Sequence, residues 1–107
     1  MRLTSNQKNK IISALESFLK TDKAELRLYG SRTKDTLRGG DIDLLLLLNS
    51  PDSLAKFNEN KHHILSTIKK NLGDQKIDLL IATKHDTEQN VFLKLIYPES
   101  ILLKKWN

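Results

Sequence analysis

Apolar residues follow two different spacings along this chain, one typical of helices and the other of strands. Three segments carry apolar side chains every three or four positions and are predicted to be helices: 5–21, 53–71 and 86–96. Four shorter segments alternate or are continuously apolar and are predicted to be strands: 24–29, 41–48, 76–82 and 101–103. This order predicts an α/β fold with a single small mixed sheet and helices packed against it.

Two segments allow more detailed expectations. The unbroken leucines within 41–48 predict a central strand that is covered on both faces. In the last helix we expect Phe92, Leu95 and Ile96 to face the core, and Pro98 to end the helix because it cannot continue the hydrogen-bonding pattern.

Length and composition limit the class of protein. The 107 residues predict one domain over residues 1–107, and the absence of cysteine excludes a disulfide framework, a Cys-ligated zinc and a thiol nucleophile. The longest apolar run, 44–48, is far shorter than the roughly 20 residues of a membrane helix, and the N-terminus lacks an apolar signal segment. We therefore expect a cytoplasmic protein without a membrane partner. The net charge of +5 suits an anionic ligand such as a nucleotide, whereas the sparse aromatic residues (6%) argue against nucleic acid.

Acidic residues interrupt the two most hydrophobic predicted strands. Asp41 and Asp43 stand two positions apart, so their side chains share one face of the sheet. Asp78 interrupts the strand at 76–82, and if the two strands are neighbours the three carboxylates converge. Their mutual repulsion would be relieved by a cation, and an all-oxygen ligand set suits Mg²⁺ or Mn²⁺. The alternative for Asp41 and Asp43 is a structural role, in which they cap the turn that precedes them.

A second motif, Gly30-Ser31-Arg32, follows the first predicted strand. Glycine lets a phosphate approach the backbone, and serine offers a hydroxyl and an N–H group. A helical turn that begins at Ser31 would direct its positive end toward that anion. Arg38, further along the loop, either contacts phosphate or is solvated. Nine residues separate Ser31 from Asp41, and this combined pattern is far more specific than a Gly-Ser pair alone.

Together, the Gly30-Ser31-Arg32 motif, the Asp41-Ile42-Asp43 motif and Asp78 resemble the minimal nucleotidyltransferases. These are the smallest members of the DNA polymerase beta-like nucleotidyltransferase superfamily. The resemblance spans essentially the whole chain, although the loop is one residue shorter than the common form and Asp35 stands where a glycine often occurs. It implies the nucleotidyltransferase fold, similar to the polymerase beta palm, and transfer of a nucleoside monophosphate from ATP or another NTP to a hydroxyl with Mg²⁺.

The resemblance also implies a role for each motif residue. Asp41 and Asp43 would hold the metal ion on the nucleotide, and Asp43 and Asp78 a second ion, with Asp78 assisting deprotonation of the acceptor hydroxyl. Gly30 and Ser31 would hold the β- and γ-phosphates, with Arg32 as a helper.

The family's usual partner is implied in the same way. Minimal nucleotidyltransferases pair with small helical HEPN proteins in type VII toxin–antitoxin systems, where the antitoxin adenylylates a tyrosine of the HEPN ribonuclease toxin. The helix at 86–96 and the tail around Trp106 are our candidate docking surfaces. Three alternatives stay open: a small-molecule acceptor, a nucleic-acid end, and an antitoxin that acts by binding alone. We expect the acceptor to be brought by another polypeptide or to bind at an interface between subunits of a homo-oligomer.

Overall fold

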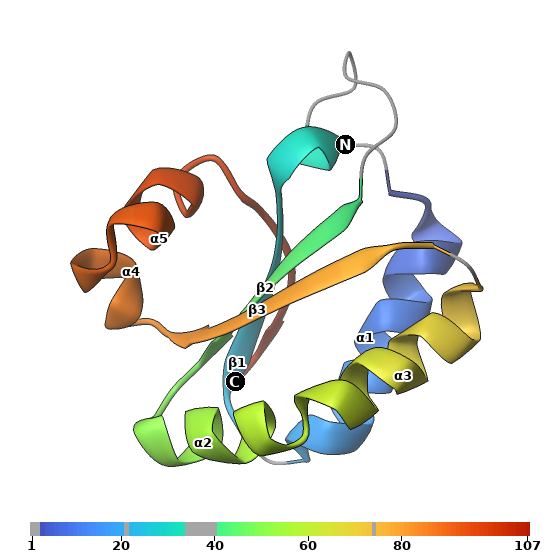
Figure 1. The fold of residues 1–107 in the computed structure, drawn as a ribbon, viewed down its shortest axis with the longest axis horizontal. Helices are drawn as coiled ribbons and strands as arrows, with labels where there is room; N and C mark the ends of the chain where they lie inside the picture. The colour runs from blue at the N-terminus through green and yellow to red at the C-terminus, as the bar shows by residue number, and fades with distance from the viewer. Residues whose placement is uncertain (1–2, 21, 34–40, 74) are drawn as a thin grey trace.

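One four-stranded mixed sheet organises the molecule, with the strand order β3-β2-β1-β4 (Figure 1). The computed structural model describes residues 3–20, 22–33, 41–73 and 75–107. The strands are β1 (Ala24–Tyr29), β2 (Ile42–Leu48), β3 (Ile77–Thr83) and β4 (Ile101–Trp106). Strands β2 and β3 are parallel, whereas β1 is antiparallel to both β2 and β4. The predicted α/β fold with one mixed sheet is confirmed.

Helices cover both faces of this sheet, but unequally. The helical elements are α1 (Ser5–Leu19), η1 (Gly30–Thr33), α2 (Pro51–Glu59), α3 (Lys61–Leu72), α4 (Asp86–Gln89) and α5 (Val91–Ile96). Figure 1 shows α1, α2 and α3 on one side of the sheet and the short α4 and α5 on the other. Among the described residues, no helix is both long and apolar enough to span a lipid bilayer.

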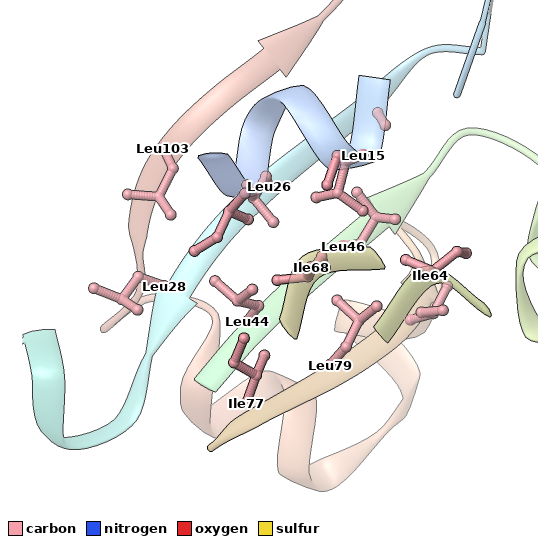
Figure 2. Close-up of a cluster of buried hydrophobic side chains, with 14 of the residues drawn as sticks. Leu15, Leu26, Leu28, Leu44, Leu46, Ile64, Ile68, Ile77, Leu79 and Leu103 are labelled. Atoms are coloured by element: carbon pink, nitrogen blue, oxygen red, sulfur yellow. The ribbon is translucent and has the colours of Figure 1, made fainter. Parts of the chain in front are cut away.

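The larger core lies between the sheet and α1, α2 and α3. Alternate residues of β2, including Leu44 and Leu46, point into it together with Leu79 of β3 (Figure 2). Ile64 and Ile68 of α3 reach the same cluster from the helix layer, and both are fully buried. The remaining residues of β2 therefore face the opposite side, because successive side chains of a strand alternate.

The smaller layer, under α4 and α5, is fastened to β1 by charged and aromatic groups. Glu25 is buried and accepts hydrogen bonds from Arg27 Nη1 at 2.9 Å and Lys84 Nζ at 2.7 Å. Arg27 Nε donates to Ser100 Oγ at 2.6 Å, and its guanidinium lies 4.6 Å from the centre of the Tyr97 ring. These contacts tie both ends of the α4–α5 segment to the same strand.

The predicted helix over 53–71 is wrong as one helix, because Asn60 divides it into α2 and α3. Asn60 adopts φ −104° and ψ 10°, and its side-chain Nδ2 donates to the carbonyl of Lys56 at 2.8 Å. This hydrogen bond to a carbonyl near the end of α2 explains the break, since asparagine side chains compete with the helical backbone for partners.

The predicted helix over 86–96 is also divided, at Asn90, and this changes which residues face inward. Asn90 is extended, and its side chain accepts a hydrogen bond from Leu93 N at 3.1 Å, so a new helix begins there. The restart buries Leu93 and leaves Phe92 and Leu95 exposed, contrary to the prediction that both face the core. The last strand is also longer than predicted, because its outer residues continue to pair with β1.

Candidate active site

Three carboxylates from adjacent strands meet on the face of the sheet that α4 and α5 only partly cover. Asp43 of β2 pairs directly with Asp78 of β3, and Asp41 precedes β2. Each of the three offers one oxygen, and these oxygens lie within 4.8 Å of one another. The juxtaposition expected from the sequence therefore occurs, because β2 and β3 are parallel neighbours in register.

The alternation of side chains along β2 explains why Asp43 lies outside the main core. Ile42 and Leu44 enter the helix-covered core, so Asp43 between them must point to the other face. Asp43 is half-buried and Asp78 is exposed at the sheet edge. The carboxylates are thus accessible to a ligand, while the strands that hold them are anchored by buried leucines.

The negative charges of the three clustered acids repel one another. Burial raises the pKa of Asp43, and the nearby Asp78 and Asp41 carboxylates raise the pKa further. Lys76 Nζ lies 3.6 Å from an Asp41 oxygen, but its side chain is largely exposed and gives only a screened interaction. Three clustered carboxylate oxygens fit a hard divalent cation such as Mg²⁺.

Gly30 places a turn of backbone against the same cluster. It begins η1 with φ +79°, a conformation that glycine adopts readily and other residues do not. A Cβ atom built on Gly30 would overlap Oδ2 of Asp43 and lie 3.3 Å from its Cγ. The chain needs glycine here both for its backbone conformation and for the room it leaves to the Asp43 carboxylate.

The other predicted nucleotide-binding residues are placed only in part. Ser31 and Arg32 follow Gly30 in η1, but their side chains lie outside the described residues. The segment 34–40, which includes Asp35 and Arg38, lies wholly outside them.

One aromatic residue beside the acids, Tyr29, was not predicted to belong to the site, and Phe92 contacts it. Tyr29 pairs with Asp43 across β1 and β2, and burial together with the Asp43 and Asp78 charges raises the pKa of its hydroxyl. The Phe92 ring meets the Tyr29 ring edge-on, with the ring centres 6.2 Å apart. Asn90 is the residue that could have indicated the exposure of Phe92, because asparagine caps helices and a new helix begins after it.

Comparison with known proteins agrees with this geometry. The family model for the nucleotidyltransferase domain matches residues 8–106, a span that contains η1, all three acids and the whole sheet. Comparisons with curated proteins and with solved structures gave no match. The family match covers nearly the whole chain, and the three acids of the chain converge beside a Gly-Ser turn. This protein therefore belongs to the nucleotidyltransferase domain family.

Proposed function

We propose that this protein is a Mg²⁺-dependent adenylyltransferase that moves AMP from ATP to a tyrosine of a cognate HEPN toxin and thereby acts as an antitoxin. The observation that carries the proposal is the convergence of Asp41, Asp43 and Asp78, beside the Gly30 turn, in a chain of the nucleotidyltransferase family. The resemblance to minimal nucleotidyltransferases supports the choice of ATP and of the HEPN partner.

The reaction needs charge neutralisation and positioning more than covalent help from the protein. Asp41 and Asp43 would hold one Mg²⁺, and Asp43 and Asp78 a second. These ions, when bound, would neutralise the phosphates and stabilise the charge that develops on the entering and leaving oxygens. The backbone N–H groups at the start of η1 would bind the β- and γ-phosphates, and Asp78 would accept the proton of the acceptor hydroxyl.

The bonds that change are few. The acceptor oxygen forms a bond to the α-phosphorus, the bond between that phosphorus and the bridging oxygen breaks, and pyrophosphate leaves. Asp43 pairs with Asp78 of β3 and its carboxylate lies against the Gly30 turn, so it is the residue that both ends of this transfer would share. Its removal should therefore have the largest effect of any single substitution at the site.

The test is transfer of label from ATP, in the presence of Mg²⁺, to a HEPN-type protein that co-purifies with the chain. The wild type should label one tyrosine of the partner and silence its ribonuclease activity. Asp43→Asn should lower the rate by about 10² to 10³, the range found when a central electrostatic stabiliser is removed. Asp52→Asn, an exposed acid in the first turn of α2, is the matched control and should behave as wild type.

The outcomes separate the possible functions. Equal transfer by Asp43→Asn and wild type would contradict the assignment of the active site. A wild type that silences the partner without labelling it would instead establish an antitoxin that acts by binding.

A further inference from the structure

Asp43 has a different kind of neighbour on each side of the central strand. Tyr29 of β1 and Asp78 of β3 are its cross-strand partners, and the side chains of paired residues lie next to each other on one face of the sheet. An aromatic ring therefore borders the Asp43 carboxylate on the β1 side, and a second carboxylate borders it on the β3 side. The position of the Asp43 carboxylate depends on both neighbours.

The charges of the cluster act to move this carboxylate. Asp78 and Asp41 each offer an oxygen within 4.8 Å of one from Asp43. Repulsion between these like charges favours rotation of the Asp43 side chain toward β1, away from Asp78. On that side the Gly30 turn leaves room for one oxygen, Oδ2, and the neighbouring ring of Tyr29 occupies the space beside it. The ring thus limits a rotation that would take the carboxylate out of the cluster.

The Tyr29 ring is itself held by the layer under α5. It is half-buried and packs against the small apolar cluster that contains Leu45 of β2 and Leu93 of α5. The Phe92 ring meets it edge-on, with the ring planes at 82°, which is a favourable arrangement of two aromatic rings. A chain of contacts therefore runs from α5 through Phe92 and Tyr29 to Asp43.

The position of Phe92 depends on how α5 is seated on the sheet. Asn90 caps the start of α5, and Leu93 is buried beneath the helix. The ion pair between Lys84 and Glu25 ties the start of the α4–α5 segment to β1. A change in the seating of α5 would therefore reach the acidic cluster by way of the two aromatic rings.

We propose that Tyr29 is a positioning residue for the metal ligand Asp43, and that α5, through Phe92, contributes to the affinity of the acidic cluster for a divalent cation. This inference rests on the metal site of the proposed function and adds to it the residues that hold one ligand in place. The ring acts by its bulk, because it keeps the Asp43 carboxylate close to Asp78 and Asp41 until a cation neutralises their repulsion. The Tyr29 hydroxyl is not required for this role.

The experiment measures the binding of Mn²⁺ to the whole chain at pH 7 without nucleotide, by the loss of the electron paramagnetic resonance signal of the free ion. Mn²⁺ accepts the same oxygen ligands as Mg²⁺. Tyr29→Leu removes the ring but keeps an apolar side chain, and it should weaken Mn²⁺ binding about tenfold, as expected when a group that orients a metal ligand is lost. Tyr29→Phe keeps the ring and should bind Mn²⁺ as wild type does. Phe92→Ala removes only the support of the ring and should weaken binding about threefold.

Phe57→Leu is the matched control, because it also exchanges an aromatic ring for leucine. Phe57 is fully buried and belongs to the main core, on the other face of the sheet. This variant should melt at a lower temperature than wild type but bind Mn²⁺ with unchanged affinity. Melting curves of every variant, taken in chelator, establish that each is folded and separate a loss of stability from a loss of ion binding.

Each result supports or overturns a particular claim. Equal Mn²⁺ affinity of Tyr29→Leu and wild type overturns the inference, and so does a loss of affinity in Phe57→Leu that matches the loss in Tyr29→Leu. If Tyr29→Phe binds Mn²⁺ as weakly as Tyr29→Leu, the hydroxyl acts and the role of the ring is overturned. If Tyr29→Leu does not fold, Phe92→Ala provides the test, and wild-type affinity in that variant overturns the inference. A wild type that binds no Mn²⁺ overturns the metal site of the proposed function, and this inference with it.

Discussion

Replacement of Gly30 by alanine should separate the two reasons for which the chain needs glycine at this turn. The first reason is the backbone, because φ is +79° and alanine is strained there. The second is space, because the new methyl group would overlap Asp43 Oδ2 and crowd its Cγ, 3.3 Å away. Only the second reason concerns the active site directly.

The two effects differ in kind. A positive φ costs an alanine about 1–2 kcal/mol of unfolding free energy, which in a domain of this size lowers the melting temperature by several degrees. The steric conflict adds little to this, because the atom in the way is the end of a side chain that can rotate. Rotation moves the carboxylate out of the three-acid cluster, however. We expect Mg²⁺ to bind about 10- to 100-fold more weakly, the range seen when a metal ligand loses its orientation.

Melting curves with Mg²⁺ and with a chelator measure both effects at once. Mg²⁺ should raise the melting temperature of the wild type, since a ligand that binds only the folded state stabilises it. Gly73→Ala is the matched control, because Gly73 has φ +80° at the end of α3 and nothing lies within 4 Å of its added Cβ. Both variants should melt below wild type in chelator, but only Gly30→Ala should lose the rise with Mg²⁺. If Gly30→Ala keeps the full Mg²⁺ effect, the claim that Gly30 makes room for a metal ligand is refuted.

Three further substitutions have distinct expected outcomes. Asp78→Asn should slow AMP transfer strongly while ATP binding, measured by calorimetry, stays near wild type, because we propose that Asp78 acts on the acceptor side. Burial raises the pKa of Glu25, but hydrogen bonds from Lys84 and Arg27 outweigh burial and leave this pKa below its ordinary value of 4.5. The charged carboxylate thus adds stability above about pH 4.5 that is lost as the pH falls through the folded-state pKa. The melting advantage of wild type over Glu25→Gln should therefore shrink in acid, and a constant difference from pH 3 to 7 would contradict this. Trp106→Ala should cost about 1–2 kcal/mol of unfolding free energy, because the indole packs on the main core, and it should weaken co-purification with the partner that the tail is expected to dock.

Much of the candidate site could be predicted from the sequence because its signals are local and strong. Asp41 and Asp43 share a face because side chains alternate along a strand. An acid within a leucine-rich strand is unusual and therefore indicates a functional role. Asp78 could be joined to them only by assuming that its strand is a neighbour, which the parallel pairing of β2 and β3 satisfies. The roles of these residues in catalysis stay a prediction that the proposed assays address.

The parts that could not be predicted depend on competition between local and tertiary interactions. Asn60 and Asn90 break helices that apolar periodicity alone would continue, because their side chains bond to nearby backbone groups. The burial of Glu25 depends on Lys84, 59 residues later in the chain, and no local sequence pattern predicts that contact. The exposure of Phe92 follows from the restart at Asn90, so an error in one helix boundary became an error about which side chains face the core.

The unequal covering of the sheet has a consequence for amide hydrogen exchange. In the α4–α5 segment Leu93 is the buried side chain that anchors the layer, and polar contacts to β1 hold its ends. Such a segment should open as a local unit. The free energy of this opening should be much lower than that of the leucine-rich strands and of α3, which enclose the main core. Its amides should exchange first, and a polypeptide bound against α5 should slow them most. The protein would then present its acidic groups from strands that open rarely, next to a helical segment that opens often.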